Sequence, residues 1–333
     1  MSMSREIGGY MELEHFRGAE MYGDLYKFNL GRTAFVWILQ HVKHNRVFIP
    51  EYICSSVPGS AAAAGFKVVS YGLDEDLEPV WGPEGAPTEE DILYLVSYYG
   101  QLTEETVKRR HAEYPKLIVD NAQAFYDAPL DLPGVWTIYT PRKYFGLSDG
   151  AYVALPSDAD ETLAADYGSL KRDRSGGRIS HLTGRLEGNA RDHYSEMLAA
   201  SDEFATAEPA KMSLLTENFL RGIDYDYVQQ KRCENYRILR ELLPDKGPNP
   251  FVKRMPSAPF AYPYYHKDGV GLRKYLAEQS IFVPTNWSYL IKKLPEGSLE
   301  YKWSADILPL PVDQRYSREE MEIIADAIKG YSL

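Results

Sequence analysis

Residues 92–120 read ILYLVSYYGQLTEETVKRRHAEYPKLIVD, with an apolar run at each end and a charged segment between them. The apolar runs at 92–100 and 116–120 predict two buried β-strands. The segment 103–114 has the charge and spacing of an amphipathic helix. A strand, a helix and a second strand in this order form a βαβ unit, whose strands lie parallel in one sheet. The stretch therefore predicts an α/β protein.

The same order occurs upstream. The sequence predicts a strand at VFIP (47–50), a helix through SSVPGSAAAAGF and a further strand at FKVVSY (66–71). Before these, RTAFVWILQHVKH (32–44) has apolar residues at helical spacing and follows Gly31, so we expect a turn that opens a helix. Together these segments predict a large domain with a mainly parallel central sheet. The segment 156–215, rich in Arg, Asp and Glu, shows no pattern that assigns its elements.

The last third of the chain has its own pattern. The predicted elements are a helix over YDYVQQKRCENYRILRELL that ends at Pro244, helices at 269–279 and 318–331, and a strand at SIFVP (280–284). A chain of 333 residues is long enough for a large and a smaller core. We expect a large domain over residues 1–222 and a small α+β domain over 223–333.

Composition narrows the class of protein. The formal net charge of −11 argues against nucleic acid or an anionic membrane as partner, because both are bound through clustered Lys and Arg. Cys54 and Cys233 lie far apart, and the seven histidines form no HxxxH or HExxH pattern, so no disulfide framework and no metal are expected. No window approaches the roughly 20 apolar residues of a membrane span, and no basic stretch followed by an apolar run opens the chain. We expect a cytoplasmic protein that binds a small molecule.

Two candidate site segments follow apolar runs, and ligands of parallel α/β sheets bind outside the carboxyl ends of the strands. In LIVDNAQAF, Asp120 closes a strand and Gln123 follows; buried at that place, the carboxylate needs a partner such as a protonated pyridine nitrogen. The alternative is a helix cap or a local turn. In YTPRKYFGLSDGAYVAL, Lys143 lies in a connection flanked by Pro and Gly, next to Arg142, whose charge favours a neutral lysine amine. The alternative is a solvated surface lysine.

A third candidate is the start of the first long helix. Gly31, Arg32 and Thr33 open it, and free backbone N–H groups with the helix dipole favour a phosphate there. Alternatively, Thr33 simply caps the helix. The chain has no GxGxxG or GxxxxGK(S/T) segment, which argues against a dinucleotide oxidoreductase and a P-loop enzyme.

In this order, the segments GRTA, IPEYICSSV, DNAQ and TPRKYFGLSDGA, with the tail DILPLPVDQRYSREEMEIIADAI, resemble the DegT/DnrJ/EryC1/StrS family of sugar aminotransferases that depend on pyridoxal 5′-phosphate (PLP). The resemblance covers most of the chain and implies fold type I. It implies that Lys143 holds PLP as a Schiff base and later shuttles a proton, and that Asp120 pairs with the pyridine nitrogen. It also implies that Gln123 lies against the ring or its oxygen.

The resemblance further implies that Gly31, Arg32 and Thr33 anchor the cofactor phosphate and that Tyr52 lies beside the ring, where packing in the core is its alternative. It implies a homodimer with active sites at the subunit interface. The reaction would transfer an amino group from a donor, commonly glutamate, to a keto-sugar or related carbonyl compound. A PLP-dependent sugar dehydratase or lyase, and a binding protein that keeps the fold without catalysis, are the alternatives.

The chain departs from the family pattern at several positions. Ile138 stands where the family often has a phosphate-binding serine, so Thr140 and Arg142 are candidate substitutes. Gly150 is followed by alanine where the family has a second glycine, and Cys54 stands near the place of a bulky aromatic residue. Asn189 is the only candidate for the family's cross-subunit asparagine. Trp287 is a candidate lining residue of the substrate cleft, with ordinary packing as its alternative.

Overall fold

The computed structural model of the chain describes residues 7–245 and 247–331. Within these residues it forms an eight-stranded sheet with the order β1-β8-β7-β6-β5-β2-β3-β4. The strands are β1 Tyr26–Phe28, β2 Arg46–Pro50, β3 Lys67–Leu73, β4 Pro79–Val80, β5 Ile92–Val96, β6 Leu117–Asp120, β7 Val135–Tyr139 and β8 Ala151–Ala154. The central strands, from β7 to β3 in the sheet order, are parallel, and β1, β8 and β4 pair antiparallel. The predicted mainly parallel sheet is confirmed.

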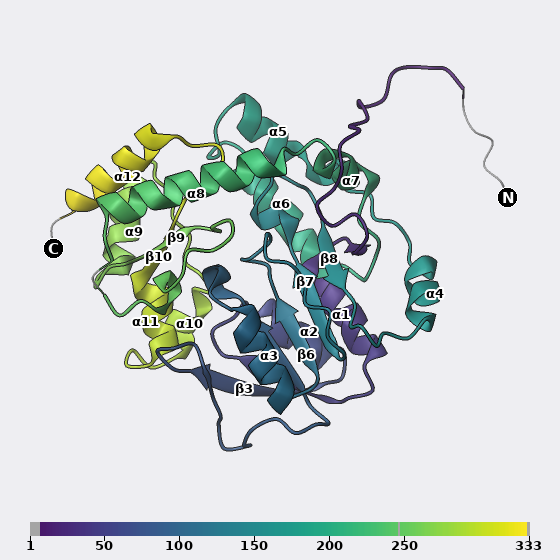
Figure 1. The fold of residues 1–333 in the computed structure, drawn as a ribbon. Coiled ribbons are helices and arrows are strands. Elements are labelled where there is room, and N and C mark those ends of the chain that lie inside the picture. The colour runs from purple at the N-terminus through teal and green to yellow at the C-terminus, as the bar shows by residue number, and fades with distance from the viewer. Residues whose placement is uncertain (1–6, 246, 332–333) are drawn as a thin grey trace.

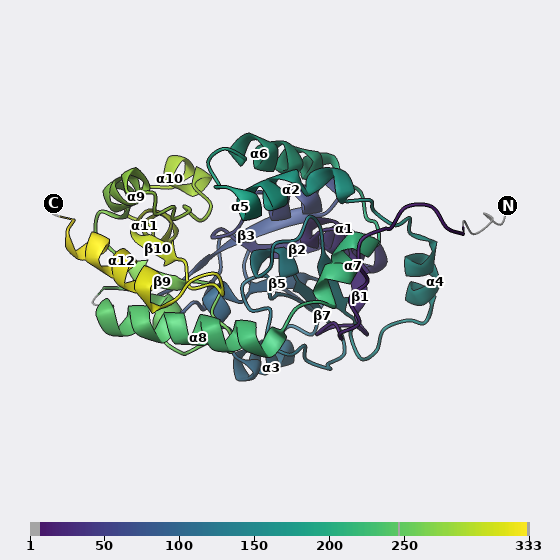
Figure 2. The same cartoon turned by 90° about the horizontal axis from the view of Figure 1, so that it is seen from above.

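Helices cover both faces of this sheet (Figure 2). The helices α1 (Gly31–His41) and α2 (Ser56–Ala63) pack on one face, and α3 (Glu104–Glu113) packs on the other. Phe35 and Ile38 of α1 are buried against even-numbered residues of β5 and β6, such as Ile118. The odd-numbered residues of the same strands face α3, because side chains alternate along a strand.

The segment without an assignable sequence pattern forms short helices. They are α4 (Thr162–Ser169), α5 (Ser180–Glu187), α6 (Tyr194–Glu203) and α7 (Leu214–Leu220). Single turns at Gly176–Arg178 and Phe204–Thr206 lie next to α5 and α6. In Figure 2, α5 and α6 lie on the same side of the sheet as α2.

The C-terminal part packs around its own apolar cluster and lies to one side of the large sheet (Figure 1). Its elements are α8 (Tyr225–Leu242), β9 (Tyr262–Tyr265), α9 (Gly269–Glu278), α10 (Tyr289–Lys293), α11 (Leu299–Asp306), β10 (Ile307–Leu310) and α12 (Arg318–Lys329). β9 and β10 pair antiparallel. Leu239, Leu272, Leu308 and Met321 are buried in the cluster. The domain boundary between residues 222 and 223 stays a prediction.

One predicted strand is wrong. Residues 280–284 form no strand; the backbone N–H of Ile281 instead closes the end of α9 by donating to Leu276 O at 2.9 Å. Ser280 has a φ of 63°, which turns the chain out of α9, and Phe282 is 54% exposed. The apolar run is therefore not a sheet segment, because the turn at Ser280 leaves part of it, such as Phe282, exposed. The strand predicted at 92–100 is shorter than expected and ends at Val96.

Among the described residues, no helix has the length and apolar character that a membrane crossing requires. The same residues contain no group of three or more His, Cys, Asp or Glu placed to hold a metal ion.

Candidate active site

The predicted site residues Asp120 and Lys143 lie at the same edge of the sheet. β6 and β7 are parallel neighbours in which Asp120 is paired with Ile138, so both chains leave the sheet on the same side. After Tyr139, the turn Pro141–Lys143 carries the lysine. Lys143 is exposed, and its Nζ lies 5.8 Å from the centroid of the Phe260 ring. The topology thus places a carboxylate and an accessible amine at adjacent strand ends.

The start of α1 contacts the end of β7. A Cβ atom added to Gly31 would lie 2.8 Å from Thr140 Oγ1 and 3.8 Å from Ile138 Cγ2. No acidic residue lies in the first turn of α1, and its N-cap, Leu30, provides no side-chain cap. The first N–H groups of the helix therefore keep their positive potential beside the Thr140 hydroxyl.

The Thr33 side chain forms hydrogen bonds with residues just before it in the chain. Its buried hydroxyl lies 2.5 Å from Asn29 Oδ1 and 2.9 Å from Leu30 O. These contacts hold the entry into α1, but the hydroxyl donates in them and caps no backbone N–H, and the N-cap position belongs to Leu30. A contact of Thr33 with phosphate stays a prediction.

Two donors hold the carboxylate of Asp120. The Tyr94 hydroxyl donates to Oδ2 at 2.9 Å, and the backbone N–H of Ala122 donates to Oδ1 at 2.9 Å. Tyr94 is buried beside Phe35, and burial, followed by the charge of Asp120, raises the pKa of its hydroxyl well above the ordinary value. The phenol therefore stays a donor and fixes the orientation of Asp120. The sequence interpretation missed Tyr94, although a hydroxyl in an otherwise aliphatic run was a visible signal.

Gln123 is buried and faces the connection after β5. Its Oε1 accepts from the backbone N–H of Tyr99 at 2.9 Å, and Tyr99 has a φ of 48°. A non-glycine residue in this left-handed region is strained and needs support. The side chain of Gln123 supplies part of that support; its predicted contact with the cofactor stays a prediction.

Tyr52 is packed in the core on the α3 face. It is completely buried, with its ring centroid 4.4 Å from that of Trp287 and 5.3 Å from that of Trp303. Asp120 bonds to Tyr94, which belongs to the cluster on the opposite, α1 face. Tyr52 and Trp287 therefore make the contacts that packing in the core requires. Tyr52 as a neighbour of the ring and Trp287 as a residue of the substrate cleft stay predictions.

The remaining candidates are placed as follows. Arg32 donates from Nη1 to the Phe204 carbonyl at 2.9 Å. Cys54 is exposed just before α2, and Asn189 makes local bonds to the backbone of Arg191 and Asp192 between α5 and α6. A role of Asn189 across a subunit interface stays a prediction.

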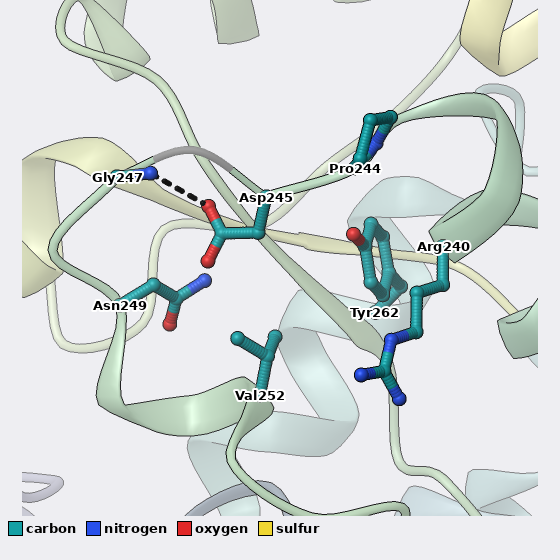
Figure 3. Close-up of a pocket in the computed structure, with 7 residues that line it drawn as sticks. All are labelled: Arg240, Pro244, Asp245, Gly247, Asn249, Val252 and Tyr262. Carbon is teal, nitrogen blue, oxygen red and sulfur yellow. Dashed lines mark hydrogen bonds between the residues drawn. The ribbon is translucent and has the colours of Figure 1, made fainter.

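Two hollows of the surface lie outside this group of residues. Figure 3 shows one in the C-terminal part, where Gly247 N donates to Asp245 Oδ1 at 3.2 Å. Its lining residues are Arg240, Pro244, Asp245, Gly247, Asn249, Val252 and Tyr262. None of these is a predicted site residue. A second, open hollow borders Phe145, Gly146 and Leu147, directly after Lys143.

Neither a protein-family model nor a curated protein matches the sequence. Solved structures match most of the chain. DesV from S. venezuelae, in complex with a ketimine intermediate, is 18% identical with a TM-score of 0.62, and the match covers 95% of this chain and 90% of DesV. The sugar aminotransferase CalS13 from Micromonospora echinospora is 14% identical with a TM-score of 0.61, over 92% of this chain and 87% of CalS13.

A DegT DnrJ EryC1 StrS aminotransferase from Brucella abortus is 15% identical with a TM-score of 0.56, and the match covers 92% of this chain and 85% of that protein. At such identities the likeness establishes the fold. The chain has the fold of the fold type I aminotransferases, as the resemblance of its motifs predicted.

Proposed function

We propose that this protein is a PLP-dependent aminotransferase that moves an amino group from a donor such as glutamate to a keto-sugar or a related carbonyl compound. One observation carries the proposal. Asp120, Lys143 and the contact between Gly31 and Thr140 lie at the ends of neighbouring strands and at the start of α1. A pyridine nitrogen, an aldehyde and a phosphate group would each meet a partner there.

The residues fit this cofactor chemically. Asp120 is half-buried and already oriented by two donors, so it can accept from a protonated ring nitrogen without reorganising. The exposed amine of Lys143 is accessible to an aldehyde. The close approach of the Gly31 backbone to Thr140 Oγ1 forms a cradle that a side chain at residue 31 would fill.

Bound PLP supplies an aldehyde that links to lysine and a ring that withdraws electrons from the reacting carbon. Lys143 would bind the aldehyde in the resting protein and, once displaced by the donor amine, carry a proton between the substrate carbon and C4′ of the cofactor. Asp120 would keep the ring nitrogen protonated.

The solved structures support the choice of aminotransfer and of a sugar-like acceptor, because CalS13 is described as a sugar aminotransferase. A cytoplasmic homodimer, in which the second subunit completes each site, is part of this proposal. Asn189 is the candidate residue whose side chain would enter the active site of the partner subunit.

The test begins with PLP and the purified protein. We expect a visible absorbance band that borohydride reduction fixes onto Lys143, and bleaching of this band to pyridoxamine phosphate when glutamate is added. Lys143→Ala should lose the band, whereas Lys292→Ala, at an exposed lysine of α10, should keep it.

Each failure has its own meaning. A wild-type protein that binds no PLP would remove the enzymatic function and favour a binding protein that keeps the fold. PLP binding without bleaching by any amino donor would contradict aminotransfer and favour a dehydratase or lyase. A screen of donors and keto-sugars then identifies the substrates.

A further inference from the structure

Arginines from separate parts of the chain meet at Phe204. The guanidinium carbon of Arg142 lies 4.3 Å from the centroid of the Phe204 ring, and that of Arg178 lies 5.6 Å from it. Arg32, in the first turn of α1, donates to the Phe204 carbonyl at 2.9 Å. Phe204 thus joins the start of α1 to the turn that carries Lys143.

The guanidinium group of Arg142 has few partners. Its Nε donates to Leu147 O at 3.4 Å, which is long for a hydrogen bond. A guanidinium has five N–H donors. Within residues 7–245 and 247–331, neither Arg142 nor Arg32 forms an ion pair with a carboxylate, whereas Arg178 is paired with Asp173 at 2.7 Å.

The positive charge around Arg142 is only partly balanced by a carboxylate. Burial lowers the pKa of Arg142 to about 10; nearby Asp149 raises it, and Arg178 lowers it further. The carboxylate of Asp149 is completely buried and already accepts from Ser213 N at 2.8 Å and Ser213 Oγ at 2.7 Å. Asp149 therefore attracts Arg142 through space but, within residues 7–245 and 247–331, forms no ion pair with it. Because Arg32 is also without an ion pair in those residues, an anion bound here would stabilise the arginines.

The position of Arg142 indicates which anion. It lies between Thr140, whose hydroxyl faces Gly31, and Lys143. Ile138, at the place where the resemblance predicts a serine, offers only a methyl group toward Gly31. The N-terminal end of α1 adds its own positive potential. Arginines without ion-pair partners, a hydroxyl group and the start of a helix are the kinds of groups that bind a dianionic phosphate.

We propose that Arg142, assisted by Arg32, binds the phosphate group of PLP in place of the missing serine. The proposal rests on the proposed function, because it assigns a residue to the same cofactor. Stacking on Phe204 fixes the plane of the guanidinium while its N–H edge stays available to phosphate oxygens.

The test compares PLP with pyridoxal, which has the same ring and aldehyde but no phosphate. Dissociation constants for both compounds are measured by absorbance titration of the wild type, Arg142→Gln and Arg174→Gln. Arg174→Gln is the control, because Arg174 is an exposed arginine between α4 and the turn Gly176–Arg178. We expect Arg142→Gln to weaken PLP binding at least about tenfold, as for a lost charge-assisted bond. Pyridoxal binding should change less than about twofold, and Arg174→Gln should match the wild type.

Two results would overturn the proposal: an equal loss of affinity for PLP and pyridoxal, which marks a structural role, or unchanged PLP affinity. Arg32→Gln should shift the ratio of the two constants in the same direction and replaces Arg142→Gln if that variant does not fold. A wild type that binds neither compound refutes the proposed function itself, which is a separate outcome.

Discussion

At Gly31 the space for a side chain is already taken. The Cβ of any other residue would come within 2.8 Å of Thr140 Oγ1, and real Cβ contacts are longer. Either the hydroxyl or the first turn of α1 must then shift. Both belong to the proposed phosphate cradle, so a change of one methyl group tests whether this cradle matters.

We expect Gly31→Ala to weaken PLP binding about tenfold in an absorbance titration, because the displaced backbone N–H groups of the first turn of α1 would no longer point at the phosphate. Gly59→Ala is the matched control. An added Cβ there, inside α2, meets no atom within 4 Å, so PLP binding should be unchanged and the helix slightly stabilised. Equal PLP affinity of Gly31→Ala and the wild type would contradict the cradle.

At the scale of elements, an ion pair joins the starts of two parallel strands. Arg46 of β2 donates from Nε to Asp91 Oδ1 at 2.6 Å and from Nη2 to Oδ2 at 2.5 Å, directly before β5. Thr88 N also donates to this carboxylate at 2.7 Å. Chiefly through Arg46, these donors hold the pKa of Asp91 at about 2. The pair fixes the register of β2 against β5.

In the folded protein the pKa of Asp91 is lowered to about 2. The ionised carboxylate therefore stabilises the fold fully above the ordinary carboxyl pKa, near pH 4, and this contribution is lost as the pH falls through about 2. We expect this residue to account for about 2 kcal/mol of unfolding free energy over that window, measured by urea denaturation at each pH. In Asp91→Asn, the free energy of unfolding should fall less steeply as the pH is lowered through this window. Asp202→Asn, at an exposed position, should keep the pH dependence of the wild type. If Asp91→Asn also kept it, Asp91 would not be the source of the acid sensitivity.

At the scale of the whole molecule, α8 connects the two parts of the chain, as Figure 1 shows. Its buried Arg232 donates to Tyr144 O at 3.0 Å, to Pro259 O at 3.0 Å and to Gln314 Oε1 at 3.1 Å. One side chain therefore ties α8 to the residue after Lys143 and to two segments of the C-terminal part.

Arg232→Gln should lower the free energy of unfolding by roughly 3 kcal/mol, because buried carbonyls lose a charged donor. Arg237→Gln, at an exposed position of the same helix, should change it by less than about 0.5 kcal/mol. Urea denaturation measures both. If the two variants were equally stable, the tie through Arg232 would be energetically unimportant.

The sequence by itself determined the elements whose burial is periodic. α1, α8 and α12 each bury one face and were predictable from apolar spacing, as were β2, β3, β5 and β6. α3 buries only Val107 and was predictable from its charge and its place between two apolar runs. The short helices between Thr162 and Leu220 were not assignable; α5, for example, has no buried residue among those described. A helix without a buried face leaves no periodic signal in sequence.

The same limit applies to the site. Asp120, Gln123 and Lys143 could be found because they follow apolar runs, and such runs are a local property of the sequence. The bond between Tyr94 and Asp120, and the contact of Arg32 with Phe204, 172 residues apart, could not. Local spacing does not say which segments pack together, and only the tertiary structure decides which side chains lie beside the predicted lysine.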